Sequence, residues 1–365
     1  MAANIEEVNG VYSFAENGKK ERAWHSLGQV FDRPMFVKEA LEACNANYEV
    51  ALQPVVALTP DIVKAIENGE KIDADVLLSM MIHDSRATMR LDTNKALGLV
   101  SKGYGIVQNS EAFSFVDTLC SGQIADRDKC PTIECCGVLG HGERVFITAK
   151  FPEPVVLNAK RNDIADVYVV FTTTHDGSGA VTCMVTPIRV VCENTLSMAF
   201  KDNSGKFSFR HTSNVMKRLD LMNEENTKFA YKALNLAEVY TNALKENYEH
   251  LRNIQLSQKQ LNDIVAGIAF SDADYGLYQK TGNLYHGDIA TNGKNTFARM
   301  MNCIEKGVGQ DIIESGNGEW LINGVTSYYQ NVNKYKDDEK KFDSIMDGYV
   351  SKKVQKAFDL ILQVA

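Results

Sequence analysis

The sequence predicts an α+β protein, with an antiparallel β-rich first half followed by a helical second half. Short runs rich in Val, Ile, Phe, Tyr and Thr, bounded by Gly, Asn and Asp, dominate the first two hundred residues. The stretch from 206 to 266 then contains neither Gly nor Pro. Strand-like runs followed by helix-like runs are typical of the α+β class. We therefore expect a β-rich core domain at 1–211 and a helical region at 212–365.

The strand signature predicts β-structure at four places, which are 97–107, 144–150, 167–174 and 181–192. Apolar residues spaced by four and three between Val215 and Asn247 predict a long helix that Thr212 or Ser213 caps. Such a seam either packs on its own domain or sets the register with a partner helix. Further helices are expected at 60–68, 73–81, 110–120, 257–268, 295–306, 320–335 and 342–362.

The bulk composition indicates a soluble protein of the cytoplasm. Of the 365 residues, 44% are apolar and 24% charged, and the apolar runs are too short to cross a bilayer. The eight cysteines are scattered, so we expect reduced thiols. Cys130, Cys135 and Cys136 lack the spacing of a zinc site and are expected to be small buried side chains. The net charge of -8 argues against a general coat for nucleic acid but allows a local basic groove.

The common catalytic motifs fail on spacing. The stretch 287–296 is not a phosphate loop, and 272–283 lacks the acidic residue that a calcium loop needs. Two His-Asp pairs remain, His83-Asp84 and His175-Asp176. With His25 as a third ligand they could hold a divalent metal ion, which is the alternative hypothesis of a phosphohydrolase acting on nucleotides or nucleic acid. Otherwise no cofactor is expected.

The stretch VVFTTTHDGSGAVTCMVTPIRVVCENT, at 169–195, predicts two strands joined by a tight turn. Gly177 and Gly179 can adopt positive φ, and Asp176 can cap the turn through its side chain. His175 is not needed for a turn, so it hydrogen-bonds either a neighbouring loop or a phosphate. Pro187 cannot donate to a ladder and predicts an edge strand or a bulge. Beyond it, Arg189 forms either an ion pair with Glu193 or a phosphate contact.

Several segments together resemble a known family. They are AWHSLG (23–28), LGLVSKGYGIVQNSEAFSF (97–115), TTHDGSGAV (173–181), TPIRVVCENTL (186–196), RHT (210–212) and GEWLINGVTSYYQ (318–330). In this order they are similar to the phage/plasmid-like proteins that carry a domain of unknown function. The first segment departs from that pattern, with Ala23 where the family usually has Pro and Ser26 where it usually has Gly. The resemblance implies a setting on phages, prophages, plasmids or other mobile elements.

A hairpin-rich sheet followed by a long helix also resembles the phage single-strand annealing recombinases of the RecT, Red-beta and Erf type. This likeness is one of architecture. It implies a homo-oligomer, a ring or a filament, that holds single-stranded DNA in a basic groove beside the hairpin.

The distribution of charge also favours a nucleic-acid-binding region at the end of this hairpin. Between 187 and 218 six cationic residues stand against two acidic ones, a balance of +4, so the rest of the chain sums to -12. Phe207 and Phe209 could stack bases there or pack in a strand of the core. Gly103 and Gly105 would allow close backbone approach beside Lys102 and Tyr104. The candidate nucleic-acid-binding residues are Arg189, Arg210, His211, Lys201, Lys206, Lys217, Arg218, Lys102, Tyr104 and His175.

The sequence therefore favours a non-enzymatic, oligomeric protein that binds single-stranded DNA for annealing in recombination. The metal-dependent phosphohydrolase is one alternative. A protein of counter-defence or host interaction, without a role on DNA, is the other.

Overall fold

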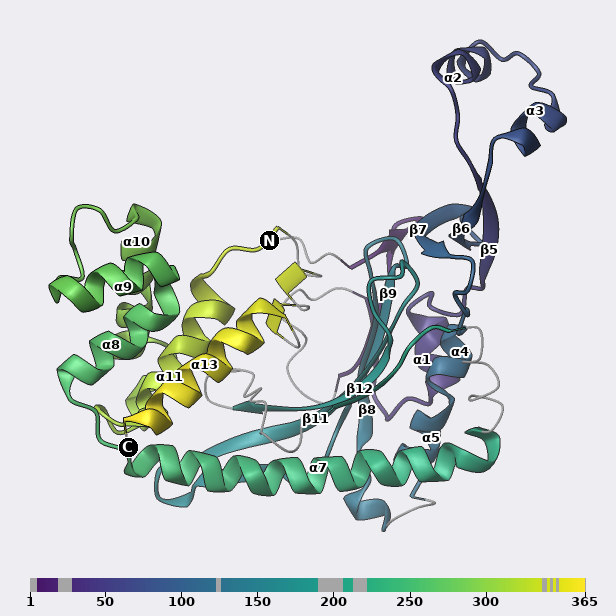
Figure 1. The fold of residues 1–365 in the computed structure, drawn as a ribbon. Coiled ribbons are helices and arrows are strands. Elements are labelled where there is room, and N and C mark those ends of the chain that lie inside the picture. Colours follow the sequence, from purple (N-terminus) through teal and green to yellow (C-terminus); the bar gives the residue numbers. More distant parts are fainter. Residues whose placement is uncertain are drawn as a thin grey trace. The chain divides into compact units, whose positions relative to one another are not determined.

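The computed structural model describes residues 5–18, 28–122, 126–189, 206–212, 222–336, 340–341, 344–345 and 348–364. Strands dominate the first half and helices the second, so the predicted α+β class is confirmed (Figure 1). Within these residues no helix is both long and apolar enough to cross a membrane.

The chain forms two compact units that alternate along the sequence. Unit 1 comprises Met1–Ala149, Val170–Met184 and Phe207–Ala233, and unit 2 comprises Lys150–Val169, Val185–Lys206 and Leu234–Ala365. These limits differ from the predicted division at residue 211.

The main sheet follows the order β13-β12-β11-β9-β8-β3-β4, with β10 beside β11. Its strands are β3 (Phe14–Asn17), β4 (Gln29–Phe31), β8 (Thr132–Leu139), β9 (Arg144–Lys150), β10 (Val155–Asn158), β11 (Asp163–Thr174), β12 (Val181–Arg189) and β13 (Lys206–Phe209). β3 pairs in parallel with β4 and antiparallel with β8, where Ala15 lies opposite Cys136. The short strands β1 (Glu7–Val8) and β2 (Val11–Tyr12) form a separate pair.

A second sheet in unit 1 has three antiparallel strands, β5 (Val50–Val56), β6 (Met81–Arg90) and β7 (Lys95–Ser101). The pair His83-Asp84 lies inside β6, which begins at Met81, where the predicted helix 73–81 was expected to end. Buried and exposed residues alternate in Met81–Arg90 only near its end. A search for alternating apolar residues therefore does not detect this strand.

Pro187 lies in β12, a strand with β13 on one side and β11 on the other. The predicted edge position is therefore wrong, and the alternative of a bulge stays a prediction.

Three helices of unit 1 lie close together (Figure 1). They are α1 (Val37–Ala43), α4 (Asn109–Ala112) and α5 (Ser114–Cys120). α1 packs on β8 and buries Leu41, while α5 buries Phe115, whose ring meets the edge of Phe171 at 5.2 Å between centroids. The buried residues Ile133 and Ile147 extend this core into β8 and β9.

Two further helices, α2 (Pro60–Glu67) and α3 (Ala74–Ser79), interrupt the hairpin between β5 and β6. We call residues 57–80 the arm. Figure 1 shows both helices beyond the ends of the two strands. Thr59 and Asp73 cap them, as Ser, Thr and Asp commonly do, yet neither helix has a buried residue.

The long helix α7 runs over Met222–Asn253. The cap predicted at Thr212 or Ser213 stays a prediction, because residues 213–221 lie outside the described ranges; Thr212 forms a bridge with Tyr104. In unit 2, Arg252 at its end donates to the Leu157 carbonyl at 2.9 Å and pairs with Glu319, also at 2.9 Å.

The described chain after α7 is helical. Helices were predicted in four of its stretches, whereas the helix at Asp272–Thr281 was not predicted. Its elements are α8 (Gln258–Ala269), α9 (Asp272–Thr281), α10 (Thr291–Lys306), α11 (Gly318–Ser327), the π-helical turn η4 (Tyr328–Val332) and α13 (Tyr349–Gln363). The rejected calcium loop is the start of α9, which Ser271 caps.

Candidate nucleic-acid interface

The turn between β11 and β12 closes by local chemistry. Gly177 has φ +82°, and the Asp176 carboxylate accepts hydrogen bonds from the Ser178 amide at 2.9 Å and its hydroxyl at 2.7 Å. Gly179 has no positive φ. The structural role predicted for Asp176 thus accounts for the turn.

His175, at the start of this turn, is buried and only 1% exposed. Its Nε2 lies 2.8 Å from Asn109 Oδ1, and the Asn109 amide donates to the Ala46 carbonyl at 2.8 Å. That second bond orients the amide, so Nε2 carries the proton and Nδ1 is a bare acceptor. Among the residues that the structure describes, Nδ1 has no hydrogen-bond partner. Burial lowers the pKa of His175 to about 3, so the ring is neutral and offers a phosphate no charge.

Tyr104 and His211 come from separate segments and meet in unit 1. Their rings stack at 4.9 Å with 11° between planes. The Tyr104 hydroxyl donates to the Thr174 carbonyl at 3.2 Å, next to His175, and His211 Nδ1 contacts the Gly105 carbonyl at 3.3 Å. His211 is 8% exposed and burial lowers its pKa. The predicted residues Tyr104, His175 and His211 thus gather at the end of β11 as packed side chains.

Lys102 is exposed and pairs with Asp84 at 2.6 Å, so its charge is balanced within unit 1. Gly103, expected to allow close approach, has no atom within 4 Å of the position of an added Cβ. The glycines of unit 1 that do allow such approach are others, including Gly98 and Gly142.

Arg210 is exposed and follows β13, the first strand of the main sheet. Within the described part of the chain it forms no ion pair. Lys206 is half-buried at the start of β13, and Arg189 ends β12. The side chain of Arg189, and Lys201, Lys217 and Arg218 altogether, lie outside the described residues, so their predicted roles stay predictions.

The aromatic residues of β13 have different surroundings. Phe207 is 8% exposed and packs against Phe115, so it belongs to the core. Phe209 is half-buried, with its ring edge-on to Phe207 at 5.8 Å. Lys232 of α7 places Nζ 4.8 Å from the Phe207 ring. We call Phe209, Arg210 and Lys232 the basic strip.

Lys232 was not among the predicted site residues. A signal for it existed, because Lys228 and Lys232 stand four apart in the predicted helix and therefore share a face. The apolar periodicity of that helix identifies only its packed face, to which Lys228 and Lys232 do not belong.

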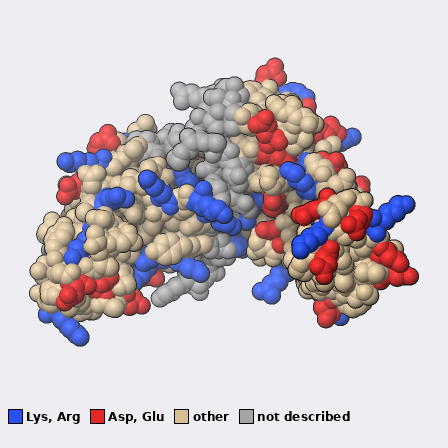
Figure 2. Space-filling model, turned by 90° about the horizontal axis from the view of Figure 1, so that it is seen from above, with Lys and Arg blue, Asp and Glu red and all other residues tan. Residues whose placement is uncertain are grey.

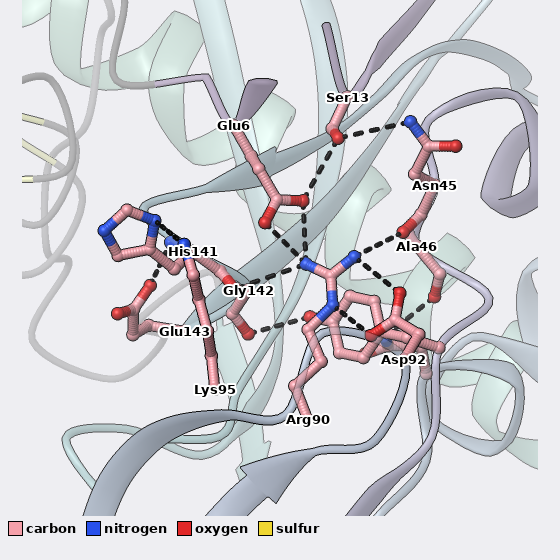
Figure 3. A network of polar contacts seen from close by, with 12 residues as sticks. Glu6, Ser13, Asn45, Ala46, Arg90, Asp92, Lys95, His141, Gly142 and Glu143 are labelled. Carbon is pink, nitrogen blue, oxygen red and sulfur yellow. Dashed lines mark hydrogen bonds and ion pairs between the residues drawn. The ribbon is translucent and has the colours of Figure 1, made fainter. Parts of the chain in front are cut away.

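A second set of polar residues surrounds Arg90 in unit 1 (Figure 3). These residues were not among the predicted site residues either. Arg90 is completely buried, and Glu6 and Asp92 approach its guanidinium from different sides. Glu6 accepts from Nη1 at 2.6 and 2.7 Å, and Asp92 accepts from Nε at 2.7 Å and from Nη2 at 3.1 Å. The Tyr48 ring lies flat beneath the charge, 3.9 Å from its carbon.

This network reaches the turn that carries His175. The Tyr48 hydroxyl donates to the Gly142 carbonyl at 2.7 Å, and the His175 amide donates to the next carbonyl, that of Glu143, at 2.8 Å. The Tyr48 and His175 rings meet edge to face at 6.0 Å. The network therefore holds the turn that carries His175 through backbone and ring contacts.

No group of three or more His, Cys, Asp or Glu side chains able to hold a metal ion occurs in the described ranges. His83 is exposed in β6, His175 is bonded to Asn109, and His25 lies outside those ranges. On the face seen in Figure 2, cationic and acidic side chains are interspersed. Any attraction for a polyanion is therefore local.

Comparison with known proteins gives one match. The model of the family described as "Domain of unknown function (DUF932)" matches residues 96–346. No curated protein and no solved structure matches the chain.

Proposed function

Since the chain belongs to the family described as "Domain of unknown function (DUF932)", we propose its function from the described residues. We propose that it is a non-enzymatic protein that binds single-stranded DNA and promotes the annealing of complementary strands. The basic strip would make the contact. We also propose a setting on a phage, plasmid or other mobile element, in the cytoplasm of a bacterial host, because of the segments that resemble such proteins.

The observation that carries the proposal is the exposed guanidinium of Arg210, which forms no ion pair within the described residues. An exposed arginine without a carboxylate neighbour can bind a phosphate through two hydrogen bonds without first losing a partner. Lys232, also exposed and without an ion pair there, adds a second cation to the same unit. The segment 206–212 contains two cations and no acid.

The strip suits a single strand better than a duplex because it joins cations to an aromatic ring. Phe209 is half-buried, with its ring edge-on to that of Phe207, so part of its surface faces solvent. Bases of a single strand are free to stack on such a ring, whereas those of a duplex are already stacked. His175, His211 and Tyr104 would support the strip from within unit 1 and would not contact DNA themselves.

Annealing requires two strands to be held close together, and we propose a homo-oligomer, a ring or a filament, for that purpose. Light scattering with and without single-stranded DNA would measure the oligomer directly. The metal-dependent alternative has no comparable support, because the described His and Asp residues do not converge on a point.

The proposal predicts binding that depends on Arg210 and on salt. The measurement is fluorescence anisotropy of a labelled single-stranded oligothymidine, between about 50 and 200 mM salt. Arg210→Gln should weaken binding and lower the slope of log K against log salt by about 0.7, the value for one lost phosphate contact on a single strand.

Arg299→Gln is the matched control. Arg299 is an exposed arginine on α10 and, like Arg210, forms no ion pair within the described residues. It should leave binding unchanged. The proposal is ruled out if the unaltered protein shows no affinity for the oligothymidine that salt weakens. It is also ruled out if Arg210→Gln and Arg299→Gln change the affinity equally.

A further inference from the structure

Two buried thiols touch in the core of unit 1. Cys44 Sγ lies 2.8 Å from Cys136 Sγ, and neither residue is exposed. A covalent disulfide spans about 2.0 Å, so the sulfurs need to approach by less than about 1 Å to bond. Both cysteines are free.

The two residues stand on elements that already pack together. Cys44 caps the C-terminal end of α1, and Cys136 lies in β8, on which α1 packs. The adjacent Cys135 points away, to Thr148 Oγ1 at 2.9 Å, so it does not compete for Cys44.

We infer that Cys44 and Cys136 are a site of reversible oxidation, which a small disulfide such as oxidised glutathione converts into an intramolecular disulfide. This inference is independent of the proposed DNA binding. Its structural effect would lie next to the Arg90 network, because the neighbouring Asn45 accepts from Arg90 through its carbonyl at 3.4 Å.

The reaction takes place in two exchange steps. One cysteine thiolate attacks the small disulfide, forms a mixed disulfide and releases one small thiolate. The second cysteine then attacks the mixed disulfide, forms the bond between Cys44 and Cys136 and releases the other small thiolate. The two cysteine protons end on the released thiols, so two protein thiols are oxidised while one small disulfide is reduced to two thiols.

Burial controls the rate of this reaction. Neither thiol is exposed, and burial raises the pKa of Cys136 well above its ordinary value. The first exchange therefore waits for local opening around α1, and we expect oxidation to be slow in the native protein.

The experiment counts thiols in the full-length chain. After incubation with oxidised glutathione under native conditions, the protein is denatured, alkylated and analysed by peptide mass mapping. The reduced chain has eight thiols, and the oxidised chain should have six, with one peptide pair joined through Cys44 and Cys136. The melting temperature should rise on the order of 10 °C, since the bond would close a loop with a separation of 92 residues, and fall again with a reductant.

Three variants distinguish this pair from unspecific oxidation. Cys44→Ala and Cys136→Ala should form no internal bond, whereas Cys303→Ala, at a buried cysteine of unit 2, should form it as before. The inference is overturned by eight free thiols, by glutathione adducts without an internal bond, or by a link between other cysteines. The mapping of the unaltered chain decides the question even if a variant does not fold.

Discussion

Arg90 carries a charge in a place that water does not reach, and its surroundings show how the sequence makes this possible. Its guanidinium is held by Glu6 and Asp92 and covered by the Tyr48 ring. A buried charge is tolerated only when it is paired and hydrogen-bonded on most sides. Gly142 completes the site, because a Cβ there would lie 3.0 Å from Nη1 of Arg90.

Arg90→Met should therefore destabilise unit 1 by about 3–5 kcal/mol, because it leaves Glu6 buried without its cation. Urea unfolding followed by circular dichroism measures this change. Lys102→Gln is the control, since it removes a cation from an exposed ion pair and should cost less than about 1 kcal/mol. Equal losses for the two variants would show that the buried pair does not stabilise the unit.

His175 should make stability depend on pH, with a sign that follows from its burial. Its pKa falls from about 6.5 in the unfolded chain to about 3 in the folded one. Above pH 6.5 both states are neutral and the group has no effect. As the pH falls toward 3, only the unfolded chain binds the proton, so the folded state loses about 1.4 kcal/mol per pH unit.

His175→Gln should remove this dependence. Urea unfolding at pH 7, 6 and 5 would show a shallower loss for the variant than for the unaltered chain. Parallel losses would mean that His175 is protonated in the folded protein. The buried His211, whose pKa is lowered for the same reason, is retained in both proteins and contributes equally.

For single residues, the sequence predicted the roles of the turn residues but not the partners of the buried charge. Asp176 and Gly177 were understood from local rules, because a turn is closed by its own side chains. Arg90 could not be recognised, since its partners lie as far away as Glu6 and no local pattern connects them. For His175 the sequence left two partners open, and the long-range contact with Asn109 decides between them.

Among the elements, the close contact between β7 and the turn after β11 requires a residue without a side chain at position 98. A Cβ at Gly98 would lie 2.5 Å from the Cα and from the carbonyl oxygen of Asp176. Neither of those backbone atoms can rotate away, so only glycine lets the strand and the turn touch.

Gly98→Ala should force these elements apart at a cost of about 1–3 kcal/mol. Thermal melting would then fall by several degrees. Gly103→Ala, a few residues further along, should have no such effect, because nothing lies within 4 Å of its added Cβ. A melting temperature that Gly98→Ala leaves unchanged would contradict the close contact.

Helices were predicted better than strands, for a physical reason. A helix shows its packed face within one segment, so α8 was found within one residue of its limits and α10 at its C-terminal end. A strand is stabilised by partners elsewhere in the chain, and β5, β6 and β8 were missed. β9 was found at its limits because its burial alternates along most of its length.

For the whole molecule, the net charge of -8 means that the proposed binding to a polyanion would rely on a few cations. On the face seen in Figure 2, cationic and acidic side chains are interspersed. The sequence predicts the cations for such binding in 187–218. Of these, Arg210 forms no ion pair within the described residues, and Lys232 is an additional candidate. The two compact units could not be predicted, because each is assembled from separate stretches of the chain.

The arm has a consequence for how the protein can be changed. Because α2 and α3 bury no residue, neither supports the core of unit 1. Six large apolar side chains at or beside the arm are more than a third exposed, namely Leu58, Val63, Ile66, Val76, Leu78 and Ile82. Replacing the arm by a short turn, or fusing a label at Gly69, would leave the contacts in the core of unit 1 intact. Insertions and deletions should therefore be tolerated there more easily than in the strands that carry the arm.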